Sequence, residues 1–519
     1  MEANQAIHWC GMNRRLFLIQ SGTLVSSLYS LPVPLFSAPV FKTDPFSIGI
    51  ASGDPTASGV VLWTRLATDP LHGGGMENAA VEVEWRVALD DRLSKVVKKG
   101  KAIATPNLGH SVHVEVEGLA ADRWYWYQFK AGNYTSPVGR TRTMPKPGVL
   151  AAKLNFAFAS CQHWEAGLWT AYQHMADEDL DLIVHLGDYI YEGPERTNGV
   201  RKHHGPEITT LAHYRNRHAL YKSDPALQKA HQLFPWIVTW DDHEVDNNYA
   251  GDTPEDKQTR AELLERRANA YQAYYEHMPL RASSMPKGSS MRLYRALDFG
   301  SLARFSILDT RQYRTDQPCG DGNKTPCADS LNQEATLLGG EQREWLFKTL
   351  DRSQACWNVL TQQVLMARID TKPGSEESLS MDQWSGYDAD RNRILDFFAK
   401  RKPSNPIVIT GDIHSSWVAD LKTDWRDEKS PVVGTEFVGT SISSGGDGTE
   451  ERPQTQDIYR ENPHLKWFNA RRGYVRCHLS PTEYRADYRV IPYVLKPGAP
   501  VETRSSWVVT NGVAGVRKA

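Results

Sequence analysis

The spacing of apolar and polar residues changes once along the chain, near residue 150. Between residues 43 and 145, short segments such as VEVEWRVALD, HSVHVEVEGL and RWYWYQFKAG alternate apolar and polar positions with a period of two. This period is typical of strands with one buried face, and turn residues separate the segments. The pattern predicts a small β-sandwich of the immunoglobulin or fibronectin type over residues 43–145.

After residue 150 the pattern predicts strands that alternate with helices. The strands are continuous apolar runs, and helical segments such as 166–178, 257–278 and 340–353 lie between them. Continuous apolar strands are typically buried on both faces, so residues 150–519 are expected to form a layered α/β domain. The expected strands are LNFAFAS (154–160), DLIVHL (181–186), FPWIVTW (234–240), ARFSILD (303–309), WNVLTQQV (357–364) and PIVITG (406–411).

The first 42 residues form a separate segment. Arg14 and Arg15 are adjacent, an apolar uncharged stretch follows, and small residues lie near Ser37 and Ala38. This order is typical of a twin-arginine export signal, with an amphipathic N-terminal helix as the alternative. A glycine and two prolines interrupt the stretch, so it is a poor membrane span. We expect residues 1–42 to be a signal and leader, the twin-arginine translocase to be a partner during export, and the protein to be periplasmic or secreted.

The overall charge gives no sign of a nucleic-acid-binding protein. The 519 residues include 60 Lys and Arg against 62 Asp and Glu, so the formal net charge is −2. Proteins that bind nucleic acid or an anionic membrane surface through charge have a strong basic excess.

If the protein is exported, its cysteines can form disulfides. Cys319 and Cys327 flank the loop GDGNKTP, and in an exported protein such a pair is expected to form a short disulfide. Cys356 and Cys477 lie in apolar contexts and are expected to be buried, as free thiols or as a second pair. Cys161 has no evident partner.

Four of the predicted strands end in residues that can bind metal ions. Ligands of open α/β sheets bind beyond the carboxyl ends of strands, so these four ends could converge on one crevice. Each segment alone has a plain alternative, such as a buried cysteine, a turn or an acidic helix cap. Their joint occurrence favours a site for two metal ions with a bridging carboxylate. The segments are Cys161-Gln162-His163, Gly187-Asp188-Tyr189-Ile190-Tyr191, Asp241-Asp242-His243-Glu244 and Asp412-Ile413-His414.

The donor atoms indicate two unlike metals. Thiolate and phenolate suit a soft or high-valent ion, whereas carboxylate and amide oxygens suit a hard ion such as Ca²⁺ or Mn²⁺. A mixed site with both kinds of donor could therefore hold two different metals.

These segments resemble the motifs of a known family. GDYIY is similar to the Gly-Asp-x-x-Tyr motif of purple-acid-phosphatase-like metallophosphoesterases, DDHE occupies the place of their Gly-Asn-His-Glu block, and GDIH that of their Gly-His-x-His block. The closer resemblance is to PhoD-type alkaline phosphatases, and it extends over nearly the whole chain. It implies a calcineurin-like metallophosphoesterase domain with α/β/β/α layers. The stretches that carry it are FASCQ, VHLGDYIYE, WDDHEVDNNYAG, LDTRQYR, ITGDIHSSW and NPHLKWFNARRGYVR.

The resemblance implies a site with Fe³⁺ and one or more Ca²⁺ ions. Carried over by position, Cys161, Asp188, Tyr191 and His414 look like the iron ligands, with Asp188 as the bridge. Tyr189, between two of these residues, is expected only to pack.

The second metal has its own expected ligands. Asp242 and Asp412 look like them, and Asn247 or Asn248 is a further candidate, with Asn248 also expected to bind substrate. This chain has Asp where wider relatives have Asn and His, which favours a harder, calcium-like ion but leaves the ligand set open. His243 resembles the histidine that contacts the phosphate or protonates the leaving group.

Three arginines are candidates for contact with substrate. Arg311, in LDTRQYR, could clamp phosphate oxygens through its planar guanidinium, or could form a structural ion pair with a carboxylate such as Asp309. Arg471 and Arg472 could lie near the substrate, or could simply pack.

The expected function is that of an exported alkaline phosphatase and phosphodiesterase. Two cations would neutralise the phosphate oxygens, and a metal-bound hydroxide would attack small-molecule or polymer phosphoesters. Two alternatives remain open at this stage. One is a phospholipase D-like or wall-polymer phosphodiesterase on the same scaffold, and the other is a non-catalytic exported binding protein.

Overall fold

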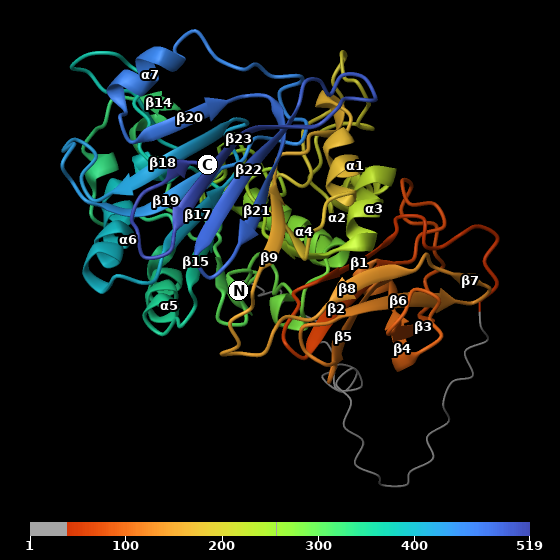
Figure 1. Cartoon of the computed structure of the whole chain (residues 1–519). Helices are drawn as coiled ribbons and strands as arrows, with labels where there is room; N and C mark the ends of the chain where they lie inside the picture. The colour runs from red at the N-terminus through yellow and green to blue at the C-terminus, as the bar shows by residue number, and fades with distance from the viewer. Residues whose placement is uncertain (1–38, 256) are drawn as a thin grey trace, which may run out of the picture.

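A computed structural model describes residues 39–255 and 257–519 of the chain. Residues 1–38 of the predicted signal and leader, including Arg14 and Arg15, lie outside the described residues. Within these ranges the chain has a mixed α/β fold built on several sheets, in agreement with the predicted class (Figure 1). All six strands predicted after residue 150 are present, each shorter than its apolar run by one or more residues.

The largest sheet has ten strands and places three of the four predicted strand ends side by side. At its centre, β9 (Leu154–Ala159), β10 (Leu182–His185) and β11 (Pro235–Val238) run parallel. The sheet order is β24-β23-β22-β21-β9-β10-β11-β1-β2-β5. The outer strands are β21 (Arg472–Leu479), β22 (Glu483–Ile491), β23 (Glu502–Thr510), β24 (Arg517–Lys518), β1 (Ile50–Gly53), β2 (Gly59–Arg65) and β5 (Ser111–Glu117).

A second sheet of seven strands packs against the first. Phe156 and Phe158 of β9 meet Phe305 and Val359 of this sheet in one apolar cluster, so the interior between the sheets is continuous. Its order is β12-β13-β15-β17-β19-β18-β20. The strands are β12 (Arg295–Phe299), β13 (Ala303–Ile307), β15 (Trp357–Thr361), β17 (Pro406–Thr410), β18 (Ser416–Lys422), β19 (Val432–Val438) and β20 (Leu465–Asn469).

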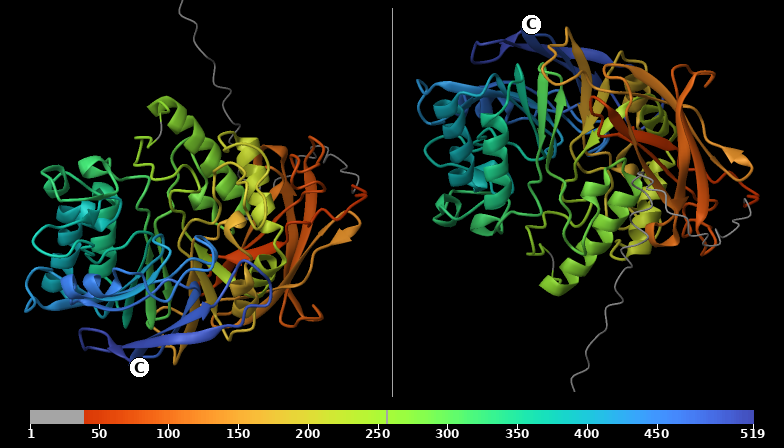
Figure 2. Two further views of the ribbon diagram at one scale, coloured as in Figure 1. Left: turned by 90° about the horizontal axis from the view of Figure 1, so that it is seen from above. Right: turned by 90° about the horizontal axis from the view of Figure 1, so that it is seen from below.

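Helices cover the outer faces of the paired sheets. Four of them pack on the ten-stranded sheet and two on the seven-stranded sheet, on opposite sides of the molecule (Figures 1 and 2). The first group is α1 (Thr170–Ala176), α2 (Leu211–Lys222), α3 (Pro225–Leu233) and α4 (Arg260–His277). The second group is α5 (Gly339–Asp351) and α6 (Asp388–Arg401), and the short α7 (Thr455–Glu461) lies beside β20.

The helix starts are encoded locally. Thr259 and Glu262 form a reciprocal capping box at the start of α4, and the Asp224 carboxylate caps α3, in which Pro225 is the first residue. Such caps satisfy backbone N–H groups that have no partner inside the helix.

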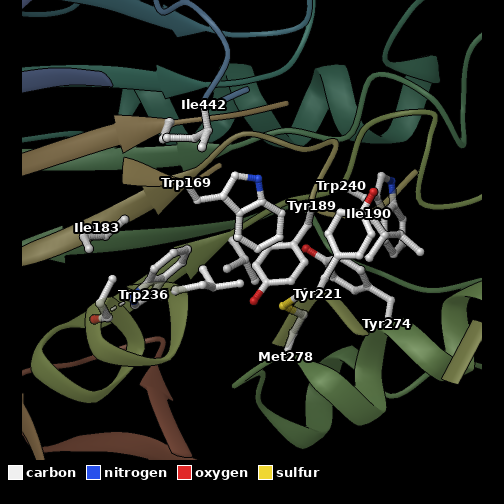
Figure 3. Packing of buried hydrophobic residues seen from close by; sticks show 14 of the residues in the cluster. Trp169, Ile183, Tyr189, Ile190, Tyr221, Trp236, Trp240, Tyr274, Met278 and Ile442 are labelled. Atoms are coloured by element: carbon white, nitrogen blue, oxygen red, sulfur yellow. Dashed lines mark hydrogen bonds between the residues drawn. The ribbon is translucent and has the colours of Figure 1, made fainter. Parts of the chain in front are cut away.

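Aromatic residues fill the layer between the ten-stranded sheet and its helices. Figure 3 shows Trp169, Tyr189, Trp236 and Tyr274 in this cluster. Tyr189 is fully buried and its hydroxyl lies 2.8 Å from Nε2 of His231, so the packing role predicted for it is confirmed.

The N-terminal strands are not an isolated pair of sheets. A five-stranded sheet packs on β1, β2 and β5 through an apolar cluster, but those three strands extend the ten-stranded sheet. The junction is the parallel pair β1–β11, with Ser52 opposite Pro235. The sequence pattern did not reveal this junction, because periodicity reports which face of a strand is buried and not which strand it pairs with. The five strands are β3 (Val81–Ala88), β4 (Val96–Ala104), β6 (Trp124–Ala131), β7 (Tyr134–Thr135) and β8 (Gly139–Arg142).

The predicted short disulfide is confirmed. Cys319 and Cys327 are bonded, and the loop between them contains β14 (Asn323–Lys324), which pairs with β16 (Leu379–Ser380). Cys356 and Cys477 are free thiols. Cys477 is buried as expected, but the expected burial of Cys356 is wrong, because its side chain is partly exposed.

None of the helices in residues 39–255 and 257–519 combines the length and the apolar character that a membrane crossing requires.

Candidate metal centre

The four predicted strand ends meet at one place in the structure. Ala159, His185 and Val238 stand in one row across the parallel strands β9, β10 and β11, so the segments that follow them leave the sheet at the same edge. The fourth segment comes from β17 in the other sheet. Gly411, directly after β17, allows this approach, because a Cβ there would lie only 2.5 Å from the Ser160 hydroxyl oxygen.

The four residues predicted as iron ligands lie together. Ligand atoms of Cys161, Asp188 and His414 all fall within 4.8 Å of one another, so the three could hold a metal ion. The Tyr191 hydroxyl lies 2.7 Å from Oδ2 of Asp188 and 3.2 Å from Nε2 of His414. Cys161, Asp188 and Tyr191 are buried.

Carboxylates continue this cluster in a second direction. Asp188, Asp242 and His243 form another group with ligand atoms within 4.8 Å, and Asp241, Asp242 and Asp412 form a third. Asp188 therefore belongs to the first two groups, and Asp242 links the second to the third. Asp241 lies in one of the segments predicted to bind metal, but it was not assigned as a ligand.

Several carboxylate oxygens at the centre have no hydrogen-bond donor among the described residues. They are Asp188 Oδ1, Asp241 Oδ2 and Asp242 Oδ1, and all three are buried, although Asp242 Oδ1 lies 3.5 Å from a guanidinium nitrogen of Arg311. A buried carboxylate oxygen without a donor is costly unless a cation faces it.

Burial controls the protonation of the first group. It raises the pKa of the Asp188 carboxyl, the Cys161 thiol and the Tyr191 phenol well above their ordinary values. Burial also lowers the pKa of His414 to about 3, which leaves its imidazole neutral with a free lone pair. A bound cation would reverse the preference of the acidic groups, because it stabilises their anionic forms.

The pKa values of two neighbouring carboxyls, those of Asp242 and Asp412, are shifted in opposite directions. Burial acts to raise the pKa of Asp242, but Arg311 and His243 outweigh it and hold this pKa below its ordinary value. Burial raises the pKa of Asp412 to about 7. Such divided values are common at functional sites.

Arg311 is fully buried and forms ion pairs with four carboxylates. Its guanidinium contacts Asp241 and Asp382 at 2.5 and 2.7 Å, and Asp242 and Asp412 at 3.5 and 3.4 Å. The ion pair that the sequence left open as an alternative is thus present, with these four partners. Asp309 instead accepts the backbone N–H of Arg311.

His243 has a partner that the sequence did not identify. Nδ1 of His243 lies 2.7 Å from Oε2 of Glu192, and Oε1 of Glu192 accepts the backbone N–H of Asn247. Glu192 is buried, whereas the His243 side chain is 19% exposed. Burial alone would lower the pKa of His243, but Glu192, Asp242 and Asp188 raise it well above its ordinary value. The signal for Glu192 was its place directly after GDYIY.

Glu244, the last residue of DDHE, organises the loops rather than facing a ligand. Its carboxylate accepts backbone N–H groups of Asp188, Tyr189 and Asp241. Burial raises its pKa to about 7. The two strand ends after β10 and β11 are thereby bonded to one side chain.

The two asparagines occupy different positions. Asn247 is exposed and bonds to Glu255, whereas Asn248 is half-buried and donates its backbone N–H to Oδ2 of Asp242. The Asn248 side chain donates to Asp321 in the disulfide loop.

The two later arginines also differ. Arg472 is buried and bonds to the carbonyl of His414 and the hydroxyl of Ser441, so it supports the site from behind. Arg471 is partly exposed and bonds to the carbonyl of Pro492.

A fourth group of possible ligands lies beside the first. His163, Glu165 and His203 are all buried. Their nitrogens are largely engaged, since Nδ1 of His163 accepts the Glu165 N–H and Nε2 of His203 lies 3.0 Å from the Tyr221 hydroxyl. Backbone N–H groups of Arg196 and His203 bond to Glu165, so this group holds a loop in place.

Fold and site together define the class of this protein. It is a mixed α/β enzyme with buried carboxylate, imidazole, thiol and phenol groups that could hold metal ions at the carboxyl edge of its central strands. A model of the family described as PhoD-like phosphatase matches residues 156–488, and a model of the PhoD-like phosphatase N-terminal domain matches residues 34–145.

Individual relatives agree with this assignment. The chain is 53% identical over 487 residues to alkaline phosphatase D of Bacillus subtilis (strain 168), which covers 93% of this chain and 84% of the relative. A solved structure of PhoD superposes with a TM-score of 0.91 at 53% identity, over 93% of each chain. The chain belongs to the PhoD-like phosphatase family. It is a phosphatase, a hydrolase of phosphoric ester bonds.

Proposed function

We propose that the protein hydrolyses phosphate monoesters and diesters at a dinuclear site that holds Fe³⁺ and at least one Ca²⁺. The observation that carries this proposal is that Asp188 belongs to two groups of possible metal ligands. Its carboxylate lies within 4.8 Å of the ligand atoms of Cys161 and His414 in one group, and of Asp242 and His243 in another. A carboxylate in that position suits a bridge between two ions.

The residues present fit these two ions. The first group offers Cys161, Tyr191 and His414 as thiolate, phenolate and imidazole donors, which suit iron. The second offers oxygens of Asp242 and Asp412, which suit calcium. The donor-free oxygens at the centre support the fit. When bound, the cations would neutralise the phosphate oxygens and lower the pKa of water at the site.

The chain itself supplies proton control and positioning. His243, charged through its contact with Glu192, would donate a proton to the departing alkoxide. Arg311 would hold the carboxylates of Asp241, Asp242 and Asp412 in place instead of contacting substrate, because its side chain is fully buried. Asn248, which bonds to Asp242 and is half-buried, remains a proposed substrate contact.

Architecture and export complete the proposal. We assign residues 150–519 to a calcineurin-like metallophosphoesterase domain and residues 43–145 to a fibronectin- or immunoglobulin-like sandwich that shares strands with it. The sequence pattern at Arg14 and Arg15 supports twin-arginine export to the periplasm or the exterior. Small-molecule and polymer phosphoesters are the proposed substrates.

A visible absorption spectrum tests the iron assignment. Purified protein with bound iron should show a charge-transfer band from Tyr191 and Cys161, and Tyr191→Phe should abolish the phenolate component. Tyr189→Phe is the matched control, since Tyr189 is a buried tyrosine two positions away that lies in the core cluster. For Cys161→Ser, the control is Cys477→Ser, another buried free thiol. A band that survives unchanged in Tyr191→Phe and Cys161→Ser contradicts the assignment.

A further inference from the structure

A buried serine contacts the side chain of one proposed iron ligand, Tyr191, and the backbone of another, Cys161. Ser444 lies in the loop after β19, far from Tyr191 in sequence, and is 2% exposed. Its Oγ lies 2.7 Å from the Tyr191 hydroxyl oxygen and 2.7 Å from the carbonyl oxygen of Cys161. The neighbouring Ser443 is equally buried, but its hydroxyl bonds to the carbonyl of His163 and the indole of Trp169.

The hydroxyl of Ser444 has one proton and two possible acceptors. The backbone N–H of His163 already donates to Oγ of Ser444, at 3.2 Å, so the serine proton is free to point elsewhere. The Cys161 carbonyl also accepts the backbone N–H of Ser444, at 3.2 Å. This carbonyl therefore stays bonded when the hydroxyl turns toward Tyr191.

We propose that Ser444 donates a hydrogen bond to the Tyr191 oxygen when this tyrosine is an ionised iron ligand, and so tunes how strongly it donates electrons to iron. Hydrogen bonds to an ionised acceptor are about twice as strong as those to a neutral one, so the phenolate would win the proton from the carbonyl. The inference rests on the proposed iron site. Ser444 is a tuning and positioning residue and does not touch substrate.

Other contacts hold the tyrosine ring in place. The ring centroid of Tyr191 lies 4.4 Å from that of His163 and 4.1 Å from that of His243, and its backbone N–H donates to the Tyr221 hydroxyl. Loss of the Ser444 hydroxyl should therefore remove a hydrogen bond without moving the ring.

The experiment compares absorption spectra and iron potentials of wild type and three serine variants with bound iron, with Tyr191→Phe as the reference for the phenolate band. In Ser444→Ala the charge-transfer band should move to longer wavelength, because a phenolate without its hydrogen bond holds its electrons less tightly. The Fe³⁺/Fe²⁺ potential should fall, because the stronger donor stabilises Fe³⁺. Ser444→Thr, which keeps a hydroxyl, should return the band toward its wild-type position. Ser443→Ala removes buried hydrogen bonds of the neighbouring residue, to His163 and Trp169, and should leave the band and the potential unchanged.

Each outcome bears on the inference. A band and potential in Ser444→Ala identical to those of wild type overturn it. The same displacement in Ser443→Ala also overturns it, because general loosening would then be the cause. A wild-type protein without a charge-transfer band, or one whose band persists in Tyr191→Phe, overturns the iron site itself. That failure is distinct from one in which Tyr191→Phe abolishes the band and Ser444→Ala leaves it unmoved.

Discussion

Four of the residues that we propose as metal ligands have a strained backbone. Cys161, Asp188, Asp412 and His414 have φ values of 58°, 55°, 63° and 52°, a left-handed region that non-glycine residues rarely adopt. Each such residue costs roughly 1–3 kcal/mol and persists only where surrounding contacts enforce it. Here the Cys161 N–H donates to the Gly187 carbonyl, and the Asp188 N–H to Glu244. The side chains are thus aimed at one point by the backbone.

Glu192 should be needed for catalysis although it lies behind His243. Its carboxylate fixes the Nδ1–H of the imidazole and supports its positive charge. We expect Glu192→Gln to lower kcat by roughly 10- to 100-fold, since a positioned acid contributes about 10²–10⁴. KM should change little. Steady-state kinetics with a diester substrate measures both parameters.

The control for this substitution is Glu195→Gln. Glu195 is three residues away, exposed, and paired with Lys202, so its loss should leave kcat unchanged. Equal losses in both variants would show that Glu192 acts only through the general stability of this loop.

At the scale of elements, strand register brings the site together. Parallel pairing aligns the ends of β9, β10 and β11 in one row, and the first proposed ligands follow these ends by two, three and four residues. The disulfide loop is linked to the proposed metal site by hydrogen bonds. Asp321 in this loop accepts a hydrogen bond from Asn248, whose backbone in turn bonds to Asp242.

Removal of the disulfide should therefore lower stability. The bond closes a loop with a sequence separation of 8, for which the chain-entropy relation gives about 2.5 kcal/mol. We expect Cys319→Ser/Cys327→Ser to unfold at a lower temperature than wild type in a thermal scan. Full reduction should lower the wild-type Tm toward that of the double variant and leave the variant unaffected. A wild-type Tm that does not respond to complete reduction would speak against this role.

At the scale of the whole molecule, a layer of buried basic groups lies under the aromatic core. His218, His231 and His277 are buried, and both ring nitrogens of His218 lack partners among the described residues. Lys222 is buried as well, with its ammonium nitrogen 4.4 Å from the ring centroid of Trp63. Burial lowers the pKa of the three histidines well below the ordinary value and that of Lys222 to about 7.

This layer should make the fold more stable toward alkaline pH. The unfolded chain protonates its histidines near pH 6.5 and the folded chain does not, so their contribution is present above that pH and is lost below it. Between pH 7 and about 10.5 the unfolded state also binds a proton at Lys222 that the folded state lacks. Each group changes the free energy of unfolding by at most about 1.4 kcal/mol per pH unit. Below pH 7 buried acids with raised pKa values, such as Glu244 and Asp412, act in the opposite direction, so the test is confined to higher pH. The contribution of Lys222 to the Tm, measured at fixed ionic strength, should rise from pH 7 to pH 10.

Two variants isolate the lysine. Lys222→Met should flatten the rise between pH 7 and 10, because the titrating group is gone and an apolar chain of similar length remains. Lys229→Met, on the exposed face of α3, should keep the wild-type slope. Identical slopes in all three proteins would contradict the assignment to Lys222.

Prediction from sequence succeeded where the signal was local. Apolar runs such as 154–160 and 406–411 predicted buried strands, and the chemistry of Cys161, Asp188 and His414 predicted residues that do lie together. The clamp suggested for Arg311 illustrates the limit. A guanidinium suits phosphate and carboxylate alike, so only its surroundings decide which it meets.

The sequence by itself therefore determined which segments are buried, what kind of element each forms, and which donor atoms stand at the strand ends. Only the tertiary structure decided the pairing of β1 with β11, the contact of Glu192 with His243, and the approach of Ser444 to Tyr191. The physical reason is the distance along the chain over which each kind of interaction acts. Periodicity and residue chemistry are set by neighbours along the chain, whereas partners tens to hundreds of positions apart are selected by the packing of the complete fold.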